Sequence, residues 1–378
     1  MAGVTRSEVR RRAAALAGPL RERAAAAERA GRLAPESVAA MLDAGLARIL
    51  VPERFGGYEL GLGAWIDAVI EIAAADASHG WCASLLIHHP HYLAQFPLGA
   101  QEAVWADGPD VALATSLEPR CEAIADGDGY RLSGRSPFTS GILHSSWVLL
   151  GGMLPGAPPE PALFLVEAAS CTVEETWATT AMRATGSNTV VSESVPVASE
   201  RVLRIADLRE GRTPGGQIHH GAIYSAPWMS YTPLTFATPL IGCGRRAIEE
   251  LAPRLRERGG QPPAGPLALG RAHADLDAAE LLIRRAAAAA EGDEPPSLEL
   301  RARTMRDASR ASELALAAID AAVALSGSSG FAAGSALERA WRDAHFAASH
   351  VALNPSNNFA HWGRTALGLE RPGSQVMY

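Results

Sequence analysis

The order of hydrophobic and polar residues divides the chain into a helical part, a strand-rich part and a second helical part. From Thr5 to about Leu50, apolar side chains recur at the spacing of helices that bury one face. A loop at 51–60 contains proline and glycine, and helical spacing then resumes from Trp65 to Gln95. These patterns predict an N-terminal helical domain over residues 1–107.

Short alternating runs replace the helical pattern between Val111 and about Leu203. Turn sequences such as DGDG and PGAPPEP separate these runs at a spacing that is typical of an antiparallel barrel or sandwich. One run, at 130–133, predicts a strand that Gly134 interrupts before a polar turn. We therefore expect a central β-barrel or sandwich domain over residues 108–210.

The chain returns to helical spacing after Gly211 and keeps it to the end. Long helices rich in alanine, leucine and arginine are predicted over 266–291 and 297–326. Helices of this length in antiparallel order form a four-helix bundle. The expected fold class is therefore mainly α with a central β domain, and the bundle forms a C-terminal domain over 211–378.

Composition excludes several classes of function. The chain has 378 residues, of which 48% are hydrophobic and 20% charged, as in a globular protein with a large core. Its net charge of -7 argues against a nucleic-acid partner, because such binding depends on cations that neutralise phosphates. The absence of lysine excludes the phosphate-binding P-loop motif and lysine Schiff-base chemistry.

The cysteines and the hydropathy pattern predict where the protein acts. The four cysteines are scattered without metal-ligand spacing, which fits a reducing cytoplasm and predicts no metal site. The N-terminus lacks the apolar core of a signal peptide, and no uncharged apolar run reaches about 18 residues. We therefore expect a cytoplasmic protein that does not interact with membranes.

A turn of mixed chemistry follows the predicted strand at 130–133. Phe138, Thr139, Ser140 and Gly141 place an aromatic face beside two hydroxyls and an open backbone. This combination can hold a flat heteroaromatic ring by stacking and hydrogen bonding. An ordinary loop rich in serine and glycine has the same composition, so the turn alone does not decide between a ligand site and a connection.

Histidines are concentrated in the helix predicted from Ser78 to Gln95. His88 and His89 are adjacent and therefore lie about 100° apart around a helix, and His91 follows in the next turn. No cysteine or carboxylate nearby adds a third ligand, so we expect no metal site. For each imidazole taken alone, the sequence favours a half-exposed position or one satisfied within the core.

Two small-residue turns are weaker candidates for anion binding. MRATGSNT at 182–189 contains Arg183, which could meet an anion or lie in a solvated loop. SGSSG at 326–330 contains Ser328 and Ser329, and its backbone N–H groups could surround a phosphate.

Three motifs resemble those of one enzyme family across the whole chain. VPERFGG at 51–57, WATTAMRATGS at 177–187 and LERAWRDAH at 337–345 stand where the acyl-CoA dehydrogenase superfamily has similar signatures. The order of helical, β and helical domains is also that of this superfamily. The resemblance implies a homotetramer, often with flavin near the subunit interface.

One departure separates branches of the superfamily. Acyl-CoA dehydrogenases commonly place a glutamate base shortly after the RDA segment, whereas this chain reads FAASHVALN there and has His350 instead. The sequence resembles the two-component flavin monooxygenases of this fold, which include hydroxylases of 4-hydroxyphenylacetate and of steroid-ring phenols. That group has a tryptophan and a histidine eight residues apart, matched by Trp81 and His89, and a turn matched by 138–141.

The monooxygenase resemblance implies a reaction and its partners. A separate NAD(P)H:flavin reductase supplies reduced FMN or FAD. O2 is then used to hydroxylate a small aromatic substrate, most often a phenol, or a natural product, through a flavin C4a-hydroperoxide. The resemblance assigns Ser140 to a hydrogen bond with flavin N5, and His350 and His89 to the roles of base and substrate-positioning imidazole. The remaining implied flavin or substrate contacts are Trp81, Thr115, Ser116, Phe138, Thr139, Arg183, Ser328 and Ser329.

Three other functions stay open on the sequence. A flavin dehydrogenase of the same fold would need a carboxylate base elsewhere in the bundle. An N-hydroxylase of an amine, such as an amino sugar, would keep the flavin chemistry without a histidine that deprotonates a phenol. A scaffold without catalytic activity would have no affinity for reduced flavin, which a titration can measure.

Overall fold

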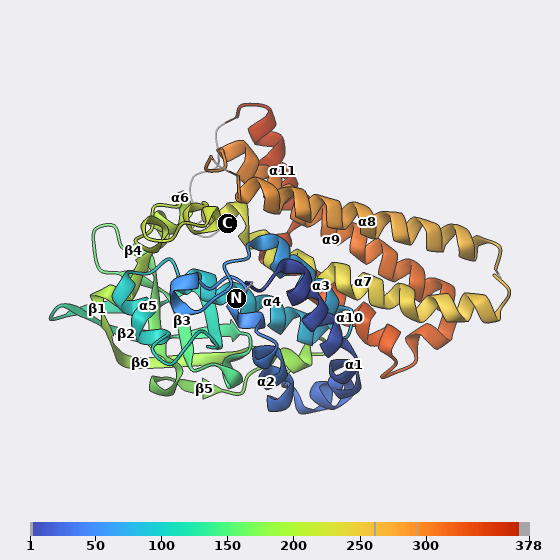
Figure 1. Cartoon of the computed structure of the whole chain (residues 1–378), viewed down its shortest axis with the longest axis horizontal. Coiled ribbons are helices and arrows are strands. Elements are labelled where there is room, and N and C mark those ends of the chain that lie inside the picture. Colours follow the sequence, from blue (N-terminus) through green and yellow to red (C-terminus); the bar gives the residue numbers. More distant parts are fainter. Residues whose placement is uncertain (1–2, 261, 293, 370–378) are drawn as a thin grey trace.

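A completely buried helix lies at the junction of the helical and β parts of the chain (Figure 1). The computed structural model describes residues 3–260, 262–292 and 294–369. The buried helix, α4, packs against α3, α7 and β1, and every one of its residues is buried. The N-terminal helices are α1 (Arg6–Ala30), α2 (Pro35–Asp43), α3 (Leu62–Ala73), α4 (Ala77–Leu93) and α5 (Leu98–Val104).

Small residues allow α4 to approach its neighbours closely. A Cβ atom on Gly80 of α4 would lie 2.3 Å from the Cβ of Ala73 in α3. A Cβ on Gly242 of α7 would lie 2.5 Å from the same Ala73 atom. The three helices therefore meet at Ala73, and only glycine fits opposite it, at position 80 of α4 and position 242 of α7.

The central domain contains one mixed sheet rather than two packed sheets. Its strand order is β5-β6-β2-β1-β3-β4-β7, and all neighbouring pairs are antiparallel except β1 and β3, which are parallel. Alternation along a strand does not reveal the direction of its partner, so the sequence could not predict this pair. The strands are β1 (Leu113–Asp126), β2 (Gly129–Thr139), β3 (Trp147–Leu154), β4 (Glu160–Glu167), β5 (Thr172–Glu174), β6 (Asn188–Ala198) and β7 (Val202–Arg204).

The expectation that Gly134 interrupts its strand is wrong. Strand β2 continues through Gly134 to Thr139, and its register with β6 shifts between Leu132 and Gly134. A Cβ on Gly134 would lie 2.6 Å from the Cα of Cys121 on β1. The glycine therefore permits an irregularity and a close strand contact instead of ending the strand.

The C-terminal helices form the predicted bundle. Figure 1 shows α7, α8 and α9 extending side by side away from the sheet, and α10 returns along α7 and α9. The helices predicted over 266–291 and 297–326 correspond to α8 and α9. The elements after the sheet are α6 (Ile205–Glu210), α7 (Thr232–Glu257), α8 (Ala264–Ala290), α9 (Leu298–Ser326), α10 (Ala336–Ala348) and α11 (Pro355–Ala366).

One helical segment has the length and composition that would allow it to cross a membrane. Within the described ranges, only Leu298–Phe331 is long and apolar enough. Its helix α9 packs against α7, α8, α10 and α11. The core helix of a bundle has the same composition, because several of its faces are covered by other helices.

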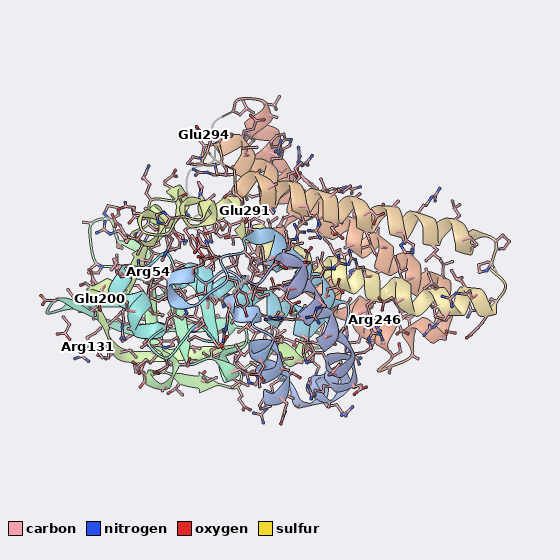
Figure 2. The ribbon with its side chains drawn as sticks, in the orientation of Figure 1. Arg54, Arg131, Glu200, Arg246, Glu291 and Glu294 are labelled. Carbon is pink, nitrogen blue, oxygen red and sulfur yellow. The ribbon has the colours of Figure 1, made fainter. Side chains whose placement is uncertain are left out.

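The bundle also supports the start of α3. Glu291, labelled in Figure 2, follows α8, and its carboxylate accepts a hydrogen bond from the backbone N–H of Leu62. This N–H is one of the donors that a helix leaves free at its first turn. Burial raises the pKa of Glu291. The contact joins the N-terminal helices to the bundle.

The contact between α3 and α4 makes a stability prediction. We expect Gly80→Ala to lower the free energy of unfolding by about 1–3 kcal/mol or more, because its Cβ overlaps Ala73. Gly270→Ala in α8 is the control, since no atom lies within 4 Å of its added Cβ and alanine favours helix by roughly 0.5–1 kcal/mol. Urea unfolding measures both changes, and equal effects would contradict the packing.

Candidate functional site

A largely apolar cavity lies between α4, β1, the end of β2, α7 and α10. Its volume is about 920 Å³, which is within the range of sites for cofactors and drug-sized ligands. The lining residues are Trp81, Leu85, His88, His89, Tyr92, Thr115, Ser116, Leu117, Glu118, Pro119, Pro137, Phe138, Ser140, Met153, Trp177, Met182, Thr185, Ser187, Thr235, Phe236, Phe346, Ala347, Ser349, His350, Val351, Asn357 and Asn358.

Hydroxyl groups are clustered on one wall of the cavity. The Oγ atoms of Ser140 and Ser187 lie 2.7 Å apart, and Thr185 Oγ1 lies 2.7 Å from Ser187 Oγ. The indole Nε1 of Trp81 donates to Ser140 Oγ at 3.3 Å. A polar edge beside an indole face fits the edge of a flat heteroaromatic ring such as flavin, which presents both donors and acceptors.

Left-handed backbone at the end of β2 positions this wall. Phe138 has a φ of 60° and Gly141 a φ of 74°. The N–H of Gly141 donates to the carbonyl of Thr185 at 3.0 Å, so the turn at 138–141 is tied to the turn at 182–187. The unusual φ of Phe138, a non-glycine residue, marks a conformation that the surrounding structure enforces.

A buried carboxylate from α10 supports the second turn. Asp343 Oδ1 accepts a hydrogen bond from the backbone N–H of Met182 at 2.8 Å, and Met182 has a φ of 51°. Burial raises the pKa of Asp343 to about 7. Asp343 therefore positions the turn that carries Thr185 and Ser187.

His89 presents a basic nitrogen to the cavity through Thr115. Its Nδ1 donates to the carbonyl of Leu113 at 2.7 Å, so Nε2 carries no proton in the neutral ring. Nε2 accepts a hydrogen bond from the hydroxyl of Thr115 at 3.0 Å. Burial lowers the pKa of His89 to about 4, which keeps the ring neutral near pH 7.

His350 has the opposite arrangement of protons. Its Nδ1 accepts the backbone N–H of Ala352 at 3.2 Å, so the neutral ring carries its proton on Nε2. The ring stacks on Phe236, with centroids 3.7 Å apart, and lies 5.8 Å from the ring of Trp81. Burial lowers the pKa of His350 to about 4. His350 is therefore a neutral hydrogen-bond donor.

The structure brings together most of the residues proposed from the sequence. The cavity wall includes His350, His89, Ser140, Trp81, Thr115, Ser116 and Phe138. The hydroxyl of Ser116 is already used, because it donates to the carbonyl of Pro137 at 2.9 Å. Phe138 is 68% exposed and lies edge-on to Trp177 at the mouth.

Four residues assigned to flavin binding lie outside this cavity. Thr139 is fully buried, and its hydroxyl donates to the carbonyl of Ser136. Arg183 is exposed and donates to the backbone carbonyls of Glu28 and Thr179, each at 3.2 Å. The other two, Ser328 and Ser329, are exposed in the turn after α9. Their side chains therefore do not contribute to the cavity of a single chain.

Several cavity residues were missed in the sequence. Ser187 stands in the motif WATTAMRATGS, in which the sequence points only to Arg183. Phe236 lies inside α7, and nothing in its helical spacing distinguishes a residue that stacks on a distant histidine. In the part of the chain that the structure describes, no group of three histidines, cysteines or carboxylates is arranged to hold a metal.

Family models match both helical parts of the chain. Residues 5–103 match the N-terminal domain of acyl-CoA dehydrogenase, and residues 234–355 match the C-terminal domain. Together these matches span most of the two helical parts, on either side of the sheet.

Individual relatives match along the whole length. The oxygenase subunit HsaA, a flavin-dependent monooxygenase of Rhodococcus jostii, is 34% identical over 94% of this chain and 97% of its own. The oxygenase component of an FADH2-dependent resorcinol hydroxylase from a Rhizobium species is 33% identical over 96% of this chain and 94% of its own. The crystal structure of 3-HSA hydroxylase from Rhodococcus has a TM-score of 0.93 and 33% identity, covering 98% of this chain and 99% of its own.

Three imidazoles with lowered pKa values predict how the stability depends on pH. His89, His91 and His350 each have a pKa lowered to about 4, so the unfolded chain binds more protons between pH 4 and 6.5. Their contribution to stability is complete above pH 6.5 and is lost as the pH falls, by up to about 1.4 kcal/mol per pH unit for each ring. The raised pKa of Asp343 opposes this trend, because its folded form binds the additional proton.

We therefore expect His350→Gln to lower the slope of the unfolding free energy against pH between pH 6.5 and 4. The decrease should be up to about 1.4 kcal/mol per pH unit, which corresponds to one proton. His220→Gln, at an exposed imidazole, is the control and should leave this slope unchanged. Urea unfolding at several pH values measures the slope. An identical slope in the wild type and His350→Gln would contradict the lowered pKa of His350.

Proposed function

The chain belongs to the two-component flavin monooxygenases of the acyl-CoA dehydrogenase fold, and we propose that it hydroxylates a small phenol. It is the oxygenase component of such an enzyme, acts on an aromatic substrate and uses reduced flavin from a separate reductase. The observation that carries the proposal is the hydrogen-bonded series from the cavity through Thr115 and His89 to the carbonyl of Leu113.

This series supports proton removal from a phenol. A phenol hydroxyl bound beside Thr115 can donate its proton to Thr115 Oγ1 while Thr115 donates to the free Nε2 of His89. Loss of the proton makes the phenol ring more electron-rich and hence a better acceptor of oxygen, and the free Nε2 of His89 is positioned to receive the proton through Thr115. The relative named resorcinol hydroxylase acts on a phenol, in agreement with this choice.

The chain's own residues also support a place for the flavin. Trp81, Ser140 and Ser187 would hold the polar edge of the ring, and apolar walls would exclude water. Bound reduced flavin supplies the reducing equivalents that activate O2. Phe138 and Trp177 would cover the mouth and keep the reacting centre dry.

The sequence hypothesis makes His350 the base. The tautomers favour different roles for the two histidines. The proton of neutral His350 is on Nε2, so this nitrogen donates rather than accepts. We propose that His350 orients an oxygen atom in the cavity, whereas His89 is the base. The short stacking distance to Phe236 would hold the His350 ring in place.

The same geometry gives less support to a flavin dehydrogenase or to an N-hydroxylase of an amine. The carboxylate on the described cavity wall, Glu118, is about half exposed and pairs with Arg120 at 2.8 Å. It is therefore poorly placed to abstract a proton from an acyl thioester or to anchor a buried amine.

We also propose that the protein is a homotetramer. Leu267 and Leu281 of α8 and Leu298 of α9 are more than half exposed, which supports a further packing partner for the bundle. Light scattering gives the number of copies, and a monomer at micromolar concentration would overturn the proposal.

Incorporation of labelled oxygen tests the proposed reaction. The protein, a flavin reductase, NADH and ¹⁸O₂ are combined with a panel of phenols, and products are analysed by mass spectrometry. One ¹⁸O atom per product supports phenol hydroxylation. Flavin oxidation that yields only H2O2 with every phenol, or an N-hydroxylated amine as the sole product, would overturn it.

Exchange of the residues in the proton path tests their roles. We expect His89→Leu and Thr115→Val each to lower kcat for hydroxylation by roughly 10²–10⁴-fold, the contribution of a positioned base. His350→Gln retains a donor and should stay within about tenfold of the wild type. Product formation at saturating reduced flavin measures these rates. A larger loss in His350→Gln than in His89→Leu would reverse the assignment.

The hydroxyl wall makes a prediction about coupling. We expect Ser140→Ala to increase the fraction of O2 released as H2O2 by about fivefold, because a lost hydrogen bond costs about 1 kcal/mol. Ser116→Ala is the matched control, since that hydroxyl already donates to Pro137 and should not affect coupling. The ratio of H2O2 to hydroxylated product measures the change. Equal coupling in both variants would remove Ser140 from the flavin edge.

A further inference from the structure

The cavity has no fixed positive charge on its described wall. None of the lining residues is an arginine, and the chain contains no lysine. Arginine and lysine are the side chains that pair with carboxylates in proteins, and arginine does so through two parallel hydrogen bonds. A ligand carboxylate in the cavity would therefore lack its usual partner.

The imidazoles in the wall do not replace that charge. Burial lowers the pKa of His89 and of His350 to about 4, and that of His88 well below its ordinary value. His88 and His89 are at most 2% exposed, so water does little to stabilise a charged ring. At neutral pH all three are uncharged hydrogen-bonding groups.

The one carboxylate on the described wall is already paired. Glu118 is 53% exposed and lies at the edge of the cavity, where Arg120, 52% exposed, neutralises it from outside. Arg120 is therefore already paired, and it is not part of the cavity wall. An anion that entered the cavity would therefore meet no free cation on the described wall.

We infer that this oxygenase selects uncharged phenols and discriminates against phenols that carry a carboxylate, an inference that rests on the proposed phenol hydroxylation. A carboxylate moved into this cavity loses its water and gains no ion pair. Such unpaired buried charges are strongly unfavourable. A neutral amide of the same shape loses far less hydration free energy. Its donors and acceptors can form hydrogen bonds with the hydroxyls and imidazoles of the wall.

Pairs of acids and amides with the same shape test this selection. The pairs are hydroxybenzoate and hydroxybenzamide, 4-hydroxyphenylacetate and its amide, and the corresponding propionate and its amide. The measurement is kcat/KM for hydroxylation at saturating reduced flavin and pH 7.5. We expect each amide that is hydroxylated to exceed its acid by roughly 100-fold or more, from the cost of an unpaired buried charge.

A variant that adds a cation to the cavity wall tests the cause of this selection. Phe346 on α10 lines the cavity and is 36% exposed, so a longer side chain can enter from there. We expect Phe346→Arg to raise the acid-to-amide ratio of kcat/KM at least about tenfold, because it provides the missing partner. Phe346→Gln, which loses the same ring without adding charge, should leave that ratio unchanged. A folded Phe346→Arg with an unchanged ratio would count against the inference.

The possible failures are distinguishable. Acids and amides hydroxylated equally well would overturn the charge selection while retaining the proposed reaction. Absence of product from every phenol, with flavin fully oxidised, would overturn the reaction. In that case, quenching of tryptophan fluorescence by the same pairs measures binding without turnover, since Trp81 lies in the wall. Equal affinities for acids and amides would then overturn the selection as well.

Discussion

Complete burial of α4 is the constraint on which the site depends. A helix covered on every side cannot expose its polar side chains to water, so each needs a partner in a neighbouring element. His89 donates to the carbonyl of Leu113 at the start of β1, and His91 bonds the carbonyl of Ile223 before α7. The bonds that satisfy the helix therefore also position β1 and the segment before α7 around the cavity.

The same burial determines the chemistry of the imidazoles. A ring without water around it remains neutral, and its protonated nitrogen is then chosen by its fixed partner. His89 Nδ1 donates a hydrogen bond to the carbonyl of Leu113, which leaves the lone pair of Nε2 to accept from Thr115. In His350, Nδ1 accepts a hydrogen bond from the N–H of Ala352, which leaves the proton on Nε2. Residues of one type thus provide an acceptor and a donor in one cavity.

The sequence predicted the architecture better than it predicted which residues form the site. Helical periodicity over long segments gave the bundle, and motif resemblance selected Trp81, His89, Ser140 and His350, which all line the cavity. Periodicity could not reveal that β1 and β3 are parallel, because direction depends on the path between strands. It also could not reveal that Phe236 stacks on His350, because this contact joins residues far apart in the chain.

The buried carboxylates near the site have structural partners, and this bears on why a monooxygenase is favoured over a dehydrogenase. Asp343 accepts the N–H of Met182, while Asp76 pairs with His79 at 2.8 Å and lies 3.4 Å from a nitrogen of Arg339. Neither residue is on the described cavity wall. A proton acceptor for carbon needs a free carboxylate facing the substrate, whereas a phenol needs only a weak base, since its proton is far more acidic. On the proposed path, the neutral imidazole of His89, which accepts a hydrogen bond from the hydroxyl of Thr115, meets the second requirement and not the first.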